Sequence, residues 1–282
     1  MGQIALAAKV THVPSLLLSE RDGSLQGRRQ AAIDSLKEIG RRARSRGADT
    51  FLIFDTHWLS NFGFHINANA RHVGSYTSHE APHLIQDLDY DYPGNPQLAD
   101  LVADEAAKNQ LDVRAHRVAS LTLEYGSIVP MRYMNADGAL KVLPAASPLF
   151  ASIEENRRFG EACRRAIMRS DAHVAVLASG SLSHKVISNR DVGEGQWDIV
   201  SSEFNRQMDL CVLELWRARR YREFVGLLPE YATKCSGEGL IADTAMLFGL
   251  LGWDNYAGAS EQLCDYFPSS GTGQVNVEFH VT

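Results

Sequence analysis

Short apolar runs alternate with longer amphipathic segments along most of this chain. The apolar runs have the length of buried strands, which we predict at residues 3–10, 50–55, 63–67, 111–115, 139–145, 172–178 and 274–281. The longer segments repeat apolar residues at helical spacing, which predicts helices at residues 27–46, 96–109, 152–169, 196–217, 219–228 and 239–251. This alternation indicates the α/β class, with a mainly parallel central sheet and helices on both of its faces.

The helix expected over residues 27–46 is the most regular of these segments. Ala32, Leu36, Ile39 and Ala43 fall on one face of it, and a glycine follows its basic last turn. The chain contains neither a repeat of 20 to 50 residues nor a linker rich in Pro, Gly and Ser. We therefore expect a single domain over residues 1–282.

Composition and charge exclude several kinds of protein. The chain has 282 residues, of which 45% are hydrophobic and 22% charged, as in an ordinary soluble globular protein. Because 28 basic residues face 34 acidic ones, neither nucleic acid nor an anionic membrane is an expected partner. The longest apolar runs fall short of the ~20 residues that span a bilayer. Four cysteines without CxxC spacing and the lack of a signal-peptide pattern favour a reduced, cytoplasmic protein.

Three histidines lie just after predicted strands. His12 follows the first strand, His57 the second, and His184 the strand at residues 172–178. In open α/β sheets, ligands collect beyond the carboxyl ends of the strands. Because these histidines are far apart in the sequence, any site that they share must be assembled by the fold.

Glu238 is the carboxylate most suited to join two of these histidines. It lies between two glycines and opens an apolar helical run, where a helix N-terminus would favour its ionised form. Two imidazoles and one carboxylate, here His12, His57 and Glu238, form the set that suits non-haem Fe²⁺, and the same set would hold Zn²⁺. Asp55 is a candidate acceptor for an imidazole N–H. His184 is left as the candidate acid and base.

Six segments in order along the chain resemble one enzyme family, the class III extradiol ring-cleaving dioxygenases of the protocatechuate 4,5-dioxygenase β-subunit superfamily. They are THVPS at 11–15, FDTHW at 54–58, LEYG at 123–126, VPMRYM at 129–134, LASGSLSH at 177–184 and FPSSGTGQVN at 267–276. Within this superfamily the chain is most similar to the branch that acts on 3,4-dihydroxyphenylacetate.

The resemblance implies a set of functional expectations. It places His12, His57 and Glu238 on the Fe²⁺ ligands, and His184 on the acid and base. It implies an α/β sandwich forming one catalytic domain, with a catechol and O₂ as substrates. The expected reaction converts 3,4-dihydroxyphenylacetate to 5-carboxymethyl-2-hydroxymuconate semialdehyde, and the expected assembly is a homo-oligomer.

The chain departs from the family at one position of the site. Many members carry an active-site histidine within Asp-His-Gly, whereas this chain has Glu124-Tyr125-Gly126. Since a phenol has an ordinary pKa of about 10, Tyr125 is expected only to form hydrogen bonds with substrate or oxygen. His116 is an alternative second base.

Several groups could bind a substrate carboxylate. They are Arg132, Lys185 and the backbone amides of the glycine-rich segment 269–273, which could form an anion nest.

Three other interpretations remain open at this point. The triad could belong to a zinc hydrolase in which His184 carries the proton. A related ring-cleaving enzyme could act on 2-aminophenol or another dihydroxy aromatic compound. The chain could also be a non-catalytic subunit of a hetero-oligomer, although it retains all three candidate metal ligands.

Overall fold

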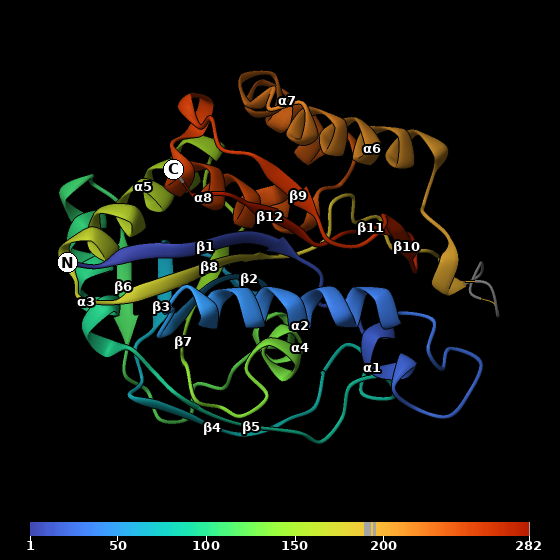
Figure 1. Ribbon diagram of the computed structural model, residues 1–282, viewed down its shortest axis with the longest axis horizontal. Helices are drawn as coiled ribbons and strands as arrows, with labels where there is room; N and C mark the ends of the chain where they lie inside the picture. The colour runs from blue at the N-terminus through green and yellow to red at the C-terminus, as the bar shows by residue number, and fades with distance from the viewer. Residues whose placement is uncertain (189–192, 194–195, 282) are drawn as a thin grey trace.

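The fold is built around an eight-stranded sheet with the order β6-β3-β7-β2-β8-β1-β12-β9 (Figure 1). The computed structural model describes residues 1–188, 193 and 196–281. The sheet strands are β1 (Gln3–Val10), β2 (Thr50–Ser60), β3 (Phe64–Asn67), β6 (Val113–His116), β7 (Lys141–Pro148), β8 (His173–Ser179), β9 (Ser260–Gln262) and β12 (Val277–Phe279). The four central strands β7, β2, β8 and β1 pair in parallel, whereas β12 and β9 extend the sheet antiparallel. The predicted mainly parallel sheet is confirmed.

Helices cover both faces of this sheet, as predicted. One face carries α1 (Ser15–Ser19), α2 (Gln30–Ser45) and α4 (Tyr125–Met134), and the other carries α3 (Pro96–Lys108), α5 (Ile153–Arg169) and α8 (Ala242–Leu251). Helices α6 (Glu203–Arg217) and α7 (Tyr221–Lys234) pack outside α8 on this second face (Figure 1). None of the helices in the described part of the chain has the length and apolar character of a membrane span.

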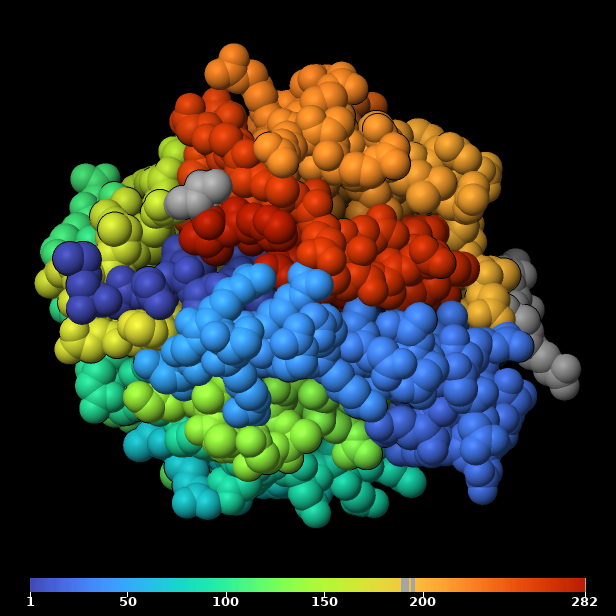
Figure 2. Space-filling model, in the orientation of Figure 1, coloured from blue at the N-terminus to red at the C-terminus, as the bar shows by residue number. Residues whose placement is uncertain are grey.

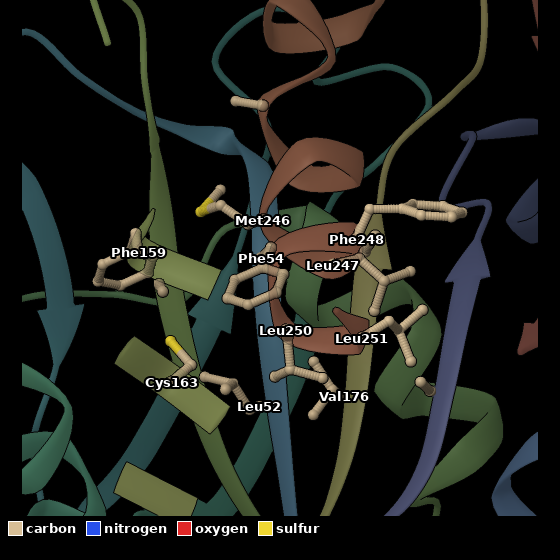
Figure 3. Close-up of a cluster of buried hydrophobic side chains, with 14 of the residues drawn as sticks. Leu52, Phe54, Phe159, Cys163, Val176, Met246, Leu247, Phe248, Leu250 and Leu251 are labelled. Atoms are coloured by element: carbon tan, nitrogen blue, oxygen red, sulfur yellow. The ribbon is translucent and has the colours of Figure 1, made fainter. Parts of the chain in front are cut away.

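The side chains of β2 show why its sequence is apolar at consecutive positions. Phe51 and Ile53 belong to the core beneath α2 and α4, whereas Leu52 and Phe54 belong to the core beneath α5 and α8. Successive side chains of a strand point to opposite faces, so a strand covered on both sides needs apolar residues throughout. Figure 3 shows Leu52 and Phe54 packed among side chains of α5 and α8.

Helix α2 is also tied to the antiparallel end of the sheet. On the face shown in Figure 2, α2 lies beside the C-terminal segment that contains β9 and β12. Arg42 of α2 pairs with Glu261 of β9 at 2.6 Å and with the fully buried Glu278 of β12 at 2.7 Å. The buried Glu278 carboxylate thus has a charged partner, without which its burial would be strongly destabilising.

Two small hairpins were not predicted from the sequence. They are β4 (Arg71–Tyr76) with β5 (Leu88–Pro93), and β10 (Phe267–Ser269) with β11 (Thr272–Gln274). Strand β5 has the sequence LDYDYP, in which buried and exposed positions alternate, so it lacks the continuous apolar run used to find the central strands. The strand expected at 274–281 is divided between β11 and β12.

Helix α4 was also missed, because Gly126 and Pro130 lie inside it. Both residues are poor helix formers, and a proline cannot donate the backbone hydrogen bond to the residue four positions earlier. That carbonyl belongs to Gly126, and it accepts a hydrogen bond from the Ser179 hydroxyl instead. The helix therefore continues through Pro130 because a neighbouring strand supplies the missing donor.

Three predicted helix boundaries were wrong. The helix expected from residue 196 begins at Glu203, and residues 196–198 form a separate 3-10 turn, while residues 194 and 195 lie outside the described part of the chain. The helix expected over 219–228 continues through Pro229 to Lys234. The helix expected from residue 239 begins at Ala242, because Gly239, Leu240 and Ile241 have positive φ angles of 54°, 57° and 61°.

The contact between α5 and α8 yields a prediction about stability. A Cβ atom on Gly160 would lie 1.9 Å from the backbone oxygen of Met246, whereas a Cβ on Gly226, in exposed α7, would meet no atom within 4 Å. Gly160→Ala should destabilise the fold by about 1–3 kcal/mol through overpacking. Gly226→Ala should stabilise it by about 0.5–1 kcal/mol through helix propensity. Urea unfolding of both variants tests this, and equal effects would contradict the described packing.

Candidate metal centre

Two strands of the central sheet and one short 3-10 helix bring the predicted ligands together. His12 follows β1 and His57 lies near the end of β2, while Glu238 approaches from the short 3-10 helix η3 (Glu238–Ile241). The Nε2 atoms of both histidines lie 3.2 Å from Oε1 of Glu238. One potential ligand atom from each residue lies within 4.8 Å of the others. His12 and Glu238 are only 2% and 3% exposed, so the group faces away from bulk water.

A bulge in β2 aims His57 toward this group. The pairing of β2 with β7 jumps from Asp55 opposite Ala146 to Leu59 opposite Ser147, which leaves residues 56–58 outside the regular ladder. Asp55 is fully buried, and its Oδ1 accepts hydrogen bonds from the backbone N–H groups of His57 at 2.8 Å and Trp58 at 3.2 Å.

The expectation that Asp55 accepts an imidazole N–H was therefore wrong. Its second oxygen accepts a hydrogen bond from the Ser127 hydroxyl at 2.6 Å, so Asp55 shapes the backbone that carries His57. A Cβ on Gly126 would lie 2.1 Å from Asp55 Oδ1, so the glycine of the LEYG segment makes room for this carboxylate.

The tautomer of His12 follows from its neighbours. The Ser179 hydroxyl donates its single proton to the carbonyl of Gly126, which Pro130 leaves without a helical partner. Ser179 Oγ lies 3.0 Å from His12 Nδ1 and can only accept there, so Nδ1 carries the proton. The Nε2 lone pair of His12 then points toward Glu238 and is free to bind a metal.

His57 is bordered by an aromatic ring and an acid. Its ring centroid lies 3.6 Å from that of Tyr125, and its Nδ1 lies 3.4 Å from Oε1 of Glu80. The buried Tyr125 hydroxyl donates a hydrogen bond to the same Glu80 oxygen. Burial and, secondarily, this bond to Glu80 raise the pKa of Tyr125, so the phenol keeps its proton. Glu80 was missed from the sequence because it belongs to no recognisable motif.

Glu238 is held in its ionised form by its neighbours. Thr56 Oγ1 donates to Oε1 at 2.6 Å, and the backbone N–H of Ser181 donates to Oε2. Burial alone would raise the pKa of Glu238, but the positive charge that the neighbouring His184 and His12 imidazoles carry when protonated holds that pKa well below its ordinary value. The expected position in the first turn of the long helix was wrong, since α8 begins only at Ala242.

His184 lies at the edge of the same group. Its Nε2 is 4.0 Å from Oε2 of Glu238, and its side chain is 32% exposed. The backbone beside it is anchored by the fully buried Asp209, which accepts hydrogen bonds from the Ser183 N–H at 3.1 Å and its hydroxyl at 2.8 Å. Asp209 also accepts hydrogen bonds from Tyr231 and Tyr266, an arrangement that sequence reasoning missed.

A buried ion pair explains one glycine of the LASGSLSH segment. Lys9 of β1 pairs with Asp243 of α8, and both side chains are almost completely buried. A Cβ on Gly180 would lie 2.7 Å from Asp243 Oδ2 and 3.0 Å from Lys9 Nζ. Gly180 therefore leaves space for this charged pair beside the candidate metal centre.

The candidate second base His116 and the candidate carboxylate-binding residue Arg132 both have partners away from the triad. His116 lies at the end of β6, and its Nε2 is 2.8 Å from Nδ1 of His65 on β3. Arg132 is half-exposed near the far end of α4, where its Nε donates to Glu20 at 3.0 Å. The structure therefore does not bring either residue to the triad.

The two remaining candidates for binding a carboxylate have different outcomes. Lys185 is exposed on the surface, and its binding of a carboxylate stays a prediction. In the segment 269–273, the amides of Ser270, Gly271 and Gly273 donate to backbone carbonyls at 3.0, 2.8 and 2.9 Å. These amides are committed to the hairpin and its neighbours, so the expected anion nest is not formed.

Comparison with known proteins agrees with this site. Residues 6–280 match the family described as the catalytic LigB subunit of aromatic ring-opening dioxygenase, and the chain belongs to this family. It is 51% identical over 92% of its length to the 3,4-dihydroxyphenylacetate 2,3-dioxygenase of Escherichia coli, covering 94% of that protein. It is 22% identical over 99% of its length to a 2-aminophenol 1,6-dioxygenase beta subunit of a Pseudomonas species, covering 95% of that chain.

A solved structure supports the fold alone. An uncharacterized protein of Escherichia coli K12 superposes with a TM-score of 0.67 at 14% identity, over 98% of this chain and all of the other. The family match and the E. coli relative confirm the prediction that this chain is an extradiol ring-cleaving dioxygenase.

The role assigned to Asp55 can be tested through stability. Asp55→Ala would leave one buried and two half-buried donors without their acceptor, which should cost about 3 kcal/mol of unfolding free energy. Asp55→Asn retains one acceptor oxygen for the two backbone N–H groups and should cost about 1 kcal/mol. Urea unfolding of the metal-free proteins measures both. A loss below about 1 kcal/mol for the alanine variant would contradict this role.

Proposed function

We propose that His12, His57 and Glu238 bind Fe²⁺ and that the chain cleaves 3,4-dihydroxyphenylacetate to 5-carboxymethyl-2-hydroxymuconate semialdehyde. The observation that carries this proposal is the meeting of two imidazoles, one just after β1 and one near the end of β2, with the carboxylate of Glu238 in η3. The substrate is proposed from the relative that shares 51% of its residues over 92% of this chain.

The donor set fits a ferrous ion. Two neutral nitrogens and one carboxylate oxygen are the ligands that non-haem Fe²⁺ sites use, and they leave coordination positions for substrate and oxygen. The Nδ1 proton of His12 directs its Nε2 lone pair into the site, and Glu238 is ionised. When bound, the iron would lower the pKa of a catechol hydroxyl and transfer electrons between the catechol and O₂.

The residues around the triad have distinct tasks in this proposal. His184 accepts a proton from the substrate hydroxyl and returns it when the ring opens, because its imidazole borders the site and imidazole is the side chain that most often carries protons in enzymes. Tyr125 takes the position at which many family members carry histidine and accepts a hydrogen bond from the substrate. Thr56 and Ser181 keep the Glu238 carboxylate in place through their hydrogen bonds.

Two alternatives use the same residues. The Pseudomonas relative is named for 2-aminophenol, which makes this compound the second candidate substrate. A zinc hydrolase remains the more remote alternative, because the same ligands would bind Zn²⁺. We further propose a homo-oligomeric, cytoplasmic enzyme, on the basis of the sequence resemblance and of the four cysteines without disulfide spacing.

A substrate and metal panel tests this function. Protein loaded anaerobically with Fe²⁺ or Zn²⁺ is mixed with 3,4-dihydroxyphenylacetate, catechol, protocatechuate and 2-aminophenol, and O₂ uptake and product absorbance are followed. We expect one O₂ consumed per ring opened, fastest with 3,4-dihydroxyphenylacetate and only with Fe²⁺. Faster turnover of 2-aminophenol would replace the proposed substrate, and Zn²⁺-dependent hydrolysis without O₂ uptake would overturn the proposal.

The role of His184 predicts that its substitution lowers the catalytic rate but leaves the affinity for Fe²⁺ unchanged. His184→Phe should lower kcat by about 10²–10⁴-fold, because it removes the general acid and base. The Fe²⁺ affinity should stay within about threefold of the wild type, because His184 is outside the ligand set. Steady-state kinetics and anaerobic metal titration measure the two quantities. A kcat above a tenth of the wild-type value would exclude this role.

A further inference from the structure

We propose that Glu80 is a positioning residue that fixes both the imidazole of His57 and the hydroxyl of Tyr125. This inference rests on the proposed metal site and adds a residue that neither the sequence motifs nor the relatives identify. Glu80 lies between β4 and β5, far in the sequence from both partners.

A single carboxylate oxygen makes both contacts. Oε1 of Glu80 accepts the hydrogen bond of the Tyr125 hydroxyl and lies 3.4 Å from Nδ1 of His57. The rings of Tyr125 and His57 lie 3.6 Å apart at an angle of 35°. The acid therefore joins the outer nitrogen of a candidate metal ligand to the ring that lies against it.

The contact with His57 selects one tautomer. A carboxylate beside Nδ1 favours the proton on that nitrogen, which leaves the lone pair on Nε2, and Nε2 faces Glu238 at 3.2 Å. His12 obtains the same tautomer from the neutral hydroxyl of Ser179. The two imidazoles are thus oriented by different means, because the Nδ1 of His12 faces a neutral hydroxyl and the Nδ1 of His57 faces a carboxylate.

The contact with Tyr125 determines whether its hydroxyl donates or accepts a hydrogen bond toward a bound molecule. A phenol has one proton, and Tyr125 gives it to Glu80, so its oxygen can only accept a hydrogen bond from a bound molecule. A catechol O–H or an aminophenol N–H can supply that bond, whereas a carbonyl oxygen cannot. Glu80 would in this way favour substrates that present a donor beside His57.

Because Glu80 is exposed, its effect on the site can be measured without an effect on the stability of the fold. Its side chain is 61% exposed, and exposed charges contribute little to stability. Variants at this position should therefore fold like the wild type, so a loss of metal affinity can be assigned to the site. Glu230 on the surface of α7 is a matched control, because it is 69% exposed and pairs with Lys234.

The test is the Fe²⁺ affinity of Glu80→Ala, Glu80→Gln and Glu230→Ala, measured anaerobically by competition with a chelator. Glu80→Ala should raise the Kd by about 10–100-fold, as expected when the partner of a ligand imidazole is removed. Glu80→Gln retains an acceptor oxygen and should lose less affinity than the alanine variant. Glu230→Ala should match the wild type, and the urea midpoints of all four proteins should agree.

The outcomes are distinct from those of the proposed function, because metal affinity is measured without turnover. A Kd for Glu80→Ala within tenfold of the wild type, or an equal loss in Glu230→Ala, would overturn the inference even if ring cleavage were confirmed. A loss in Glu80→Gln as large as in Glu80→Ala would also overturn it, since the retained oxygen would then do nothing.

A double-mutant cycle provides a second readout. Tyr125→Phe removes the hydroxyl that Glu80 orients and should raise the KM for 3,4-dihydroxyphenylacetate. If Glu80 acts on that hydroxyl, Tyr125→Phe should have a smaller effect on KM in the Glu80→Ala background than in the wild type. Additive effects on KM would contradict the proposed link.

Discussion

The structure depends on the parallel pairing of β1, β8 and β2 in the centre of a sheet that is covered on both faces. Parallel pairing aligns the carboxyl ends of these strands, so residues that are far apart in the sequence emerge at one edge. His12, Ser179 and His57 reach the same small volume for this reason. The apolar residues that drive the pairing are therefore also what assembles the candidate metal centre.

A second layer of buried polar contacts converts this proximity into defined geometry. Asp55 bends the backbone of β2 at His57, Ser179 orients His12, and Asp209 anchors the segment before His184. An unpaired polar atom would cost free energy at these buried positions, and each of these polar groups has a specific hydrogen-bond partner. The proline in α4 takes part as well, because it frees the Gly126 carbonyl for Ser179.

The sequence predicted the sheet and the triad because both have local signals. Apolar runs mark the central strands, and His12, His57 and Glu238 stand next to them or between glycines. Glu80, Lys9 and Asp209 carry no such signal, since their roles arise from contacts between distant segments. The same limit explains the errors at Asp55, His116 and Arg132. Each has a chemically suitable side chain, but its partner could be identified only after the chain had folded.

The central claim is that two imidazoles and one carboxylate of this chain hold a single ferrous ion. X-ray absorption spectroscopy of the anaerobic Fe²⁺ protein tests it most directly, because imidazole rings give a characteristic outer-shell scattering pattern. The account predicts a five- or six-coordinate ion with light-atom ligands only and two imidazoles per iron. A sulfur ligand, or an imidazole count that is unchanged in a His12→Ala variant, would contradict it.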